Sequence, residues 1–98
     1  MTGPTAGAVL TGGASRRMGT DKALVEVGGV AMAHRVAAAL VAAGCDPVWC
    51  QGGDAEALTR LGLMVRADTA PGGGPLPAIL DALRAAPDGL GVVVAACD

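Results

Sequence analysis

The sequence has almost no aromatic side chains: among its 98 residues only Trp49 is aromatic, and there is no phenylalanine or tyrosine. A core must therefore be built from valine, leucine, isoleucine, methionine and alanine, which bury less area than aromatic rings. Because small domains bury a smaller share of their surface than large ones, this core is thin for the chain's length. We expect one small domain and no second one.

Basic charge, paired cysteines and long apolar runs are also scarce. The formal net charge is −2, which argues against nucleic acid as a partner because phosphate-backbone binding needs a basic face. The three cysteines, Cys45, Cys50 and Cys97, form no C-x-x-C pair, which favours a reduced, cytoplasmic setting. No apolar run reaches membrane-spanning length, and the N-terminus does not resemble a signal peptide, so neither a membrane nor secretion is expected.

Strand and helix patterns alternate along the chain. Long helices are predicted to begin near Met32 and at Pro75, and Asp54 can cap a short helix over residues 55–61. Residues 23–27 are predicted to form a brief excursion outside the central sheet. This alternation indicates a parallel sheet with right-handed crossovers. The predicted strands cover residues 6–10, 48–50, 63–65 and 90–96.

The spacing of apolar residues also predicts which side of each long helix is buried. The set for the first helix is Met32, Val36, Leu40 and Ala43, with Gly44 closing the helix. The set for the second helix is Leu76, Ile79, Leu80 and Leu83, which leaves Asp81 and Arg84 outward.

Residues 10–22, LTGGASRRMGTDK, follow the first predicted strand and combine glycines with positive charge. Glycines let a backbone turn sharply and bring its N–H groups against a ligand. Arg16, Arg17 and Lys22 add cations, and arginine forks match phosphate oxygens. The stretch therefore predicts a site for a phosphate-rich ligand.

Two well-known phosphate loops are excluded by spacing. Gly7 and Gly12 stand at the P-loop interval, but Gly13 occupies the position of its lysine. Gly12 and Gly13 are adjacent, so the alternating glycines of the dinucleotide fingerprint are missing too. A plain glycine-rich turn with surface cations is the alternative interpretation.

Candidate residues gather at the ends of the predicted strands. Leu10, Cys50, Asp68 and Asp98 each lie at or just past such an end. In open parallel sheets, ligands bind beyond the carboxyl ends of the strands. We therefore expect these residues to contribute to one site.

The loop at residues 10–22 resembles the signature loop of molybdenum cofactor guanylyltransferases, within the wider nucleotidyltransferase superfamily. Asp68 with PGGGPL at residues 71–76 resembles the family's second motif, and Cys97-Asp98 resembles its metal-binding strand end. The resemblance implies a three-layer, Rossmann-like α/β fold with a mostly parallel sheet of the nucleotide-diphospho-sugar transferase type. Residues 1–98 would be the N-terminal nucleotide-binding half of that domain, with the sheet incomplete at its C-terminus.

The resemblance also implies roles for single residues, all of them expectations here. Arg17, Lys22 and Asp98 would be catalytic: the two cations would steady the triphosphate, and Asp98 would coordinate Mg²⁺. Asp68 would contact the nucleotide. Cys50 stands where a family member can use asparagine, and would contribute through its backbone. The guanine side would be lined by backbone groups of Leu10, Thr11 and Gly12, and Gly13 would also belong to the nucleotide site.

The implied function is a magnesium-dependent transfer of GMP from GTP to molybdopterin phosphate. The alternatives are a cytidylyltransferase of the same cofactor pathway, a sugar- or polyol-phosphate nucleotidyltransferase, and a non-catalytic nucleotide-binding domain. Because family members continue beyond the last strand, we expect this chain alone to transfer little or no nucleotide. A second copy of the chain or a missing C-terminal half would be its partner.

Overall fold

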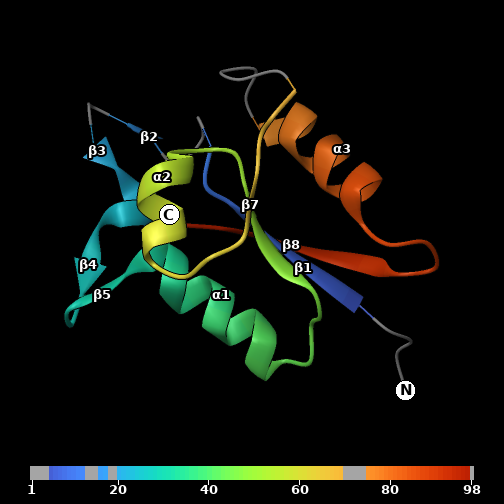
Figure 1. The fold of residues 1–98 in the computed structure, drawn as a ribbon, viewed down its shortest axis with the longest axis horizontal. Helices are drawn as coiled ribbons and strands as arrows, with labels where there is room; N and C mark the ends of the chain where they lie inside the picture. The colour runs from blue at the N-terminus through green and yellow to red at the C-terminus, as the bar shows by residue number, and fades with distance from the viewer. Residues whose placement is uncertain (1–4, 13–15, 18–19, 70–74, 98) are drawn as a thin grey trace.

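A sheet of four parallel strands forms the centre of the computed structural model, which describes residues 5–12, 16–17, 20–69 and 75–97. The strands lie side by side in the order β7–β6–β1–β8 (Figure 1). All four predicted strands are present, and the largest difference is in β7, which begins two residues later than expected. Their bounds are Thr5–Leu10 for β1, Val48–Gln51 for β6, Val65–Arg66 for β7 and Gly91–Ala96 for β8.

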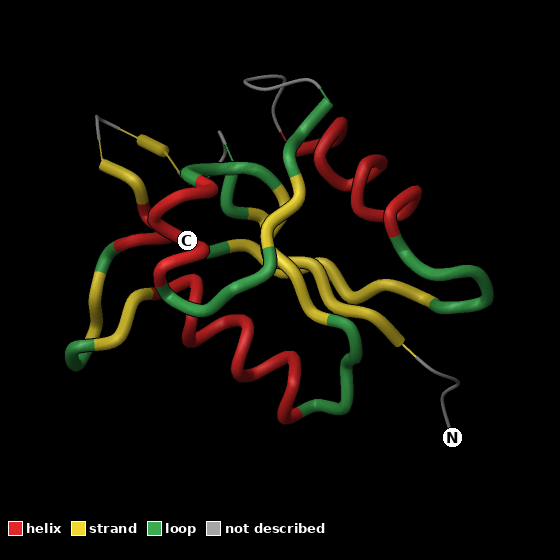
Figure 2. The backbone as a smooth tube through the Cα atoms, in the orientation of Figure 1, coloured by secondary structure: helices red, strands yellow, loops and turns green. Residues whose placement is uncertain are grey.

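Helices cover both faces of this sheet. Helices α1 (Met32–Ala42) and α2 (Ala55–Arg60) connect β1 to β6 and β6 to β7, whereas α3 (Pro75–Ala85) returns the chain past β1 to β8. Because crossovers are right-handed, reversing the direction of travel places α3 on the opposite face from α1, as Figures 1 and 2 show. The predicted three-layer α/β fold with a mostly parallel sheet is confirmed.

Two small hairpins separate β1 from α1. They stand outside the central sheet, and a single 3₁₀ turn joins them. The brief excursion predicted over residues 23–27 is thus confirmed, although it includes this turn and one strand of the second hairpin. The first hairpin pairs β2 (Arg16–Arg17) with β3 (Thr20–Asp21), the turn is η2 (Lys22–Leu24), and the second hairpin pairs β4 (Glu26–Val27) with β5 (Val30–Ala31).

The two faces of the sheet have different cores. Beneath α3, the indole of Trp49 is buried against small side chains. Beneath α1 and α2, the core is aliphatic and contains all three cysteines, which are free and buried. The cluster under α3 is Ala6, Ala8, Trp49 and Ala82, and that under α1 and α2 is Val9, Ala23, Ala33, Ala37, Leu40, Cys45, Cys50, Leu58 and Cys97.

The buried side of α3 is not the one that its leucines predict. Leu76 is 66% exposed and Leu83 is 52% exposed, whereas Ala82 is fully buried. Asp81, predicted to point outward, is also buried, while Arg84 is exposed as expected. The reason is the large Trp49 ring on the facing sheet, which leaves room only for small side chains on the helix.

We expect this reversed orientation to show in unfolding experiments. Ala82→Leu should lower the free energy of unfolding by about 1–3 kcal/mol, because added methylenes overpack the space beside Trp49. Leu83→Gln, a change on the exposed side, should alter it by less than about 0.5 kcal/mol. Urea titration followed by Trp49 fluorescence measures both. A larger loss from Leu83→Gln than from Ala82→Leu would mean that the leucine side is the packed one.

The other helices follow the sequence more closely. In α1 the buried side chains are Ala33, Ala37 and Leu40, so the prediction was right for Leu40 but wrong for Ala43, which is exposed beyond the helix end. Asp54 caps α2 as predicted, since its carboxylate accepts a 3.0 Å hydrogen bond from the Ala57 N–H. Within the described residues, no helix has the length and apolar character needed to cross a bilayer.

Candidate functional site

The carboxyl ends of the central strands meet along one edge of the sheet. Leu10 pairs with Gln51 on one side and with Ala96 on the other, and Gln51 pairs in turn with Arg66. The residues that follow each strand therefore start from a common row. This register supports the expectation that Leu10 and Asp68 lie in one region at this edge of the sheet.

Asp68 lies where the loops after β1 and β6 come together. A Cβ atom added to Gly12 would lie 2.5 Å from Asp68 Oδ2, and one added to Gly52 would also meet the Asp68 carboxylate. The two backbones approach the carboxylate this closely only because both residues lack a side chain. We refer to Thr11, Gly12, Gln51, Gly52 and Asp68 as the strand-end site.

Gln51 connects the core to Asp68. Its Oε1 accepts a 3.0 Å hydrogen bond from the indole Nε1 of Trp49. Its Nε2 donates to Asp68 Oδ1 at 3.3 Å and to the Ala67 carbonyl oxygen at 3.2 Å. Gln51 was not among the predicted site residues, although a polar side chain directly before Gly52-Gly53 at a strand end was a usable signal.

Thr11 joins the end of β1 to the end of β6. Its side chain is fully buried, and its hydroxyl donates a 2.7 Å hydrogen bond to the Gly52 carbonyl oxygen. Its backbone N–H donates to the Gln51 carbonyl oxygen at 3.2 Å. The hydroxyl thus acts within the protein by holding the β1 loop against the β6 turn, next to the backbone of Gly12.

Cys50, expected to contribute to the site through its backbone, has its side chain in the core. Its side chain is fully buried in the core under α1 and α2, and burial raises the pKa of the thiol to about 11, against the opposing effect of a hydrogen bond with Thr11. Its backbone N–H donates to the Met64 carbonyl oxygen at 2.8 Å. The Cys50 side chain and N–H are thus used inside the fold. The side chain at this strand end that reaches Asp68 belongs to Gln51.

For the remaining predicted site residues, the structure describes the backbone of two and does not describe the other two. Arg17 lies in β2 and Lys22 begins η2, so both follow the β1 loop in short backbone elements. Gly13 and Asp98 lie outside the described residues. Within the described ranges there is no group of three or more acidic, histidine or cysteine side chains that could hold a metal ion.

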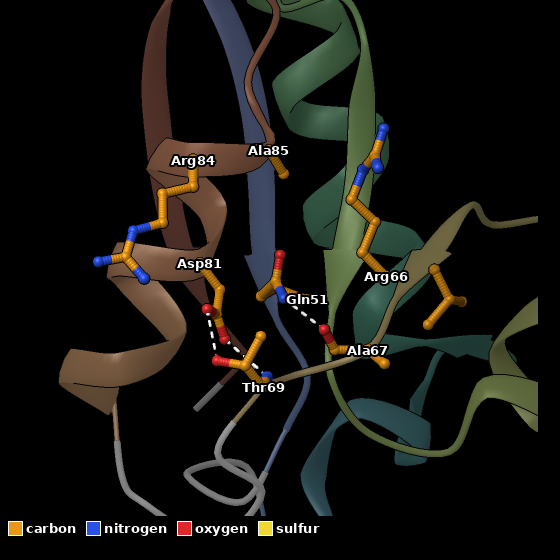
Figure 3. A pocket seen from close by; sticks show the side chains of 8 residues that line it. Gln51, Arg66, Ala67, Thr69, Asp81, Arg84 and Ala85 are labelled. Atoms are coloured by element: carbon orange, nitrogen blue, oxygen red, sulfur yellow. Dashed lines mark hydrogen bonds between the residues drawn. The ribbon is translucent and has the colours of Figure 1, made fainter.

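A groove of about 550 Å³ lies between β7 and α3, and Gln51 of the strand-end site is among the residues that line it. Polar side chains line it from both elements, with Arg66 on the strand and Arg84 on the helix (Figure 3). The guanidinium carbon of Arg66 lies 5.5 Å from the centre of the Trp49 ring, a distance at which a cation is attracted to an indole face. The groove continues the polar surface beyond the strand-end site.

Comparison with known proteins identifies the family. A profile described as the MobA-like NTP transferase domain matches residues 7–98. The chain belongs to this family. Membership confirms the resemblance drawn from the motifs at residues 10–22, 68–76 and 97–98.

Three curated relatives of this MobA-like domain share one description. A protein of Pelotomaculum thermopropionicum, named probable molybdenum cofactor guanylyltransferase, is 48% identical over 92 residues, which are 94% of this chain and 44% of that protein. Proteins of the same name from Mycobacterium tuberculosis and Mycobacterium ulcerans are 42% and 44% identical, over 87% and 83% of this chain and 43% and 41% of their own lengths. The chain therefore spans less than half the length of these relatives.

Proposed function

We propose that this chain forms the nucleotide-binding part of a molybdenum cofactor guanylyltransferase, which transfers GMP from GTP to molybdopterin phosphate. The observation that carries the proposal is the strand-end site, where Asp68 lies between the backbones of Gly12 and Gly52. This site follows the carboxyl ends of β1, β6 and β7, where open parallel sheets bind their ligands. Family membership and the names of the relatives support the same activity.

The chemistry of the site suggests how a nucleotide would lie. An ionised carboxylate only accepts hydrogen bonds, so Asp68 suits the donors of a nucleotide and repels its phosphates. Guanine offers adjacent N1–H and N2–H donors, which can face the two oxygens of one carboxylate. The phosphates would then extend toward the cationic stretch that contains Arg17 and Lys22.

In the proposed reaction, an oxygen of the acceptor phosphate attacks the α-phosphorus of GTP. A new P–O bond forms, the bond to the β-phosphate oxygen breaks, and pyrophosphate leaves with the electron pair. The protein's part is to hold the two substrates in line and to stabilise the charge that develops on the leaving group. We assign charge stabilisation to Lys22 and Arg17, and nucleotide positioning to the strand-end site.

Magnesium is part of the proposal, with Asp98 as its protein ligand. The donor set fits such an ion, because nucleotide-bound Mg²⁺ needs only one or two carboxylates and takes its other ligands from phosphates and water. Ala96, two residues before Asp98, pairs with Leu10 at the edge that carries the strand-end site. When bound, the ion would neutralise phosphate charge.

Nucleotide titrations test this proposal. We expect MgGTP to bind this chain at least about tenfold more tightly than MgATP or MgCTP, because only guanine presents both donors to Asp68. MgITP, which differs from MgGTP by the missing 2-amino group, should bind more weakly than MgGTP. Isothermal calorimetry measures all four affinities, and chelation of the magnesium with EDTA should weaken GTP binding.

The outcomes separate the alternatives. Equal affinities for the four nucleotides would contradict the guanine assignment, and tighter binding of MgCTP would favour a cytidylyltransferase. Pyrophosphate release from GTP and molybdopterin, measured for this chain and for a chain as long as its relatives, tests the transfer itself. Binding of GTP without release by the longer chain would favour a non-catalytic nucleotide-binding domain.

A further inference from the structure

Helix α3 buries a carboxylate that the proposed chemistry leaves unused. Asp81 is 8% exposed and lies on the packed side of the helix with Ala78 and Ala82. Among the side chains whose burial the structure describes, Asp81 is the one charged side chain that is buried. Burying a charge is costly unless hydrogen bonds compensate it, so the partners of Asp81 identify what the burial achieves.

Both carboxylate oxygens of Asp81 accept hydrogen bonds from one residue, Thr69. The Thr69 N–H donates to Oδ2 at 2.9 Å, and the Thr69 hydroxyl donates to Oδ1 at 2.8 Å (Figure 3). These backbone and hydroxyl bonds, with a smaller contribution from Arg84, lower the pKa of Asp81 below its ordinary value. The carboxylate is therefore ionised at neutral pH, and both bonds are charge-assisted.

The N–H of Thr69 belongs to the peptide group that follows Asp68. Because a peptide group is planar, a bond to this N–H also fixes the Asp68 carbonyl and restricts rotation about the Asp68 backbone. The peptide group that precedes Asp68 is held from the other side, since Gln51 donates to the Ala67 carbonyl oxygen at 3.2 Å. Figure 3 shows Asp81 and Gln51 reaching this segment from α3 and from the sheet.

We propose that Asp81 is a positioning residue for nucleotide binding: together with Gln51 it holds the two peptide groups that flank Asp68, so that the Asp68 carboxylate stays in the strand-end site. The inference rests on the proposed function, in which Asp68 contacts the nucleotide. It assigns no direct ligand contact to Asp81. It also gives a reason for α3 to bury an acidic side chain.

The test measures MgGTP affinity in variants that remove or keep these bonds. Asp81→Leu replaces the carboxylate with a side chain that accepts no hydrogen bond. It should weaken MgGTP binding about tenfold, the lower end of the loss seen when residues that orient metal ligands are removed. Asp81→Asn can still accept the Thr69 N–H bond and should retain most of the affinity. Ala82→Leu is the matched control, because it disturbs the same side of α3 while keeping both hydrogen bonds between Asp81 and Thr69, and it should leave the affinity of the folded protein unchanged.

A double-mutant cycle separates positioning from general damage. If Asp81 acts through Asp68, then Asp81→Leu should cause no further loss of MgGTP affinity in an Asp68→Ala background. An equal loss in both backgrounds, or wild-type affinity in Asp81→Leu, would overturn the inference. If Asp81→Leu does not fold, Asp81→Ala gives the same test, because it removes both hydrogen bonds to Thr69 without adding bulk to the helix.

Failure of the proposed function would look different. If the unmodified chain binds no MgGTP, or if Asp68→Ala binds it normally, the nucleotide role of Asp68 is wrong, and the role of Asp81 in nucleotide binding falls with it. Hydrogen exchange at the Thr69 amide checks the Asp81 bond itself, and it should accelerate in Asp81→Leu. Faster exchange with unchanged MgGTP affinity, in a chain whose Asp68→Ala variant binds poorly, would overturn the positioning role alone.

Discussion

Gly53→Ala is expected to lower the free energy of unfolding by about 3–4 kcal/mol, one of the largest effects of any single substitution in this chain. Gly53 has a φ of +91°, which disfavours any residue with a Cβ atom. The added Cβ would also meet the backbone carbonyl of Thr11 in the loop after β1. That carbonyl belongs to the main chain, so it can move only if the loop after β1 moves away from the turn after β6.

The chain contains a matched control for this effect. Gly62 has a φ of +84°, but nothing lies within 4 Å of a Cβ atom added there. Gly62→Ala should therefore lower the free energy of unfolding only by the cost of a positive φ at a residue with a Cβ atom, about 1–2 kcal/mol. Urea unfolding of both variants, followed by Trp49 fluorescence, isolates the contribution of the contact with Thr11. Equal losses would show that the β1 loop and the β6 turn do not depend on each other.

Much of this fold could be predicted because its local signals agree with its long-range contacts. Alternating strand and helix patterns predicted four parallel strands, and the cap at Asp54 fixed the start of α2. The orientation of α3 could not be predicted in the same way. Both sides of that helix carry apolar residues at helical spacing, and only the position of Trp49 on the facing sheet favours alanines over leucines.

The site residues that belong to a local sequence motif were predictable. The residues that act through hydrogen bonds to distant parts of the chain were not. Asp68 was found from its motif, and Gly12 from its place after a strand. Gln51 and Asp81 were missed because each acts through a bond to a residue distant in sequence, at separations of 17 and 12 positions. The sequence of a polar, glycine-rich turn does not indicate which helix or strand will form hydrogen bonds with it.

Lys22→Ala is expected to weaken MgGTP binding by roughly one to two decades, because a charge-assisted hydrogen bond to phosphate typically contributes about 1.5–3 kcal/mol. Lys22 opens η2, and its neighbour Ala23 is fully buried in the core under α1. The backbone that carries the lysine is thus anchored to the domain, even though each strand of the hairpin before it, β2 and β3, has only two residues.

Charge alone must be separated from position in this experiment. Arg60→Ala removes one positive charge from α2, where Arg60 is exposed and makes a 3.5 Å ion pair with Glu56. It should leave MgGTP affinity nearly unchanged, because salt screens an exposed charge that makes no direct contact with the ligand. Lys22→Arg keeps the charge and should retain part of the affinity. Thermal unfolding should change little in Lys22→Ala, since alanine suits a helical turn at least as well as lysine. If Lys22→Ala unfolds, the lysine is structural, contrary to this assignment. If Arg60→Ala weakens binding as much as Lys22→Ala does, Lys22 contributes only long-range attraction.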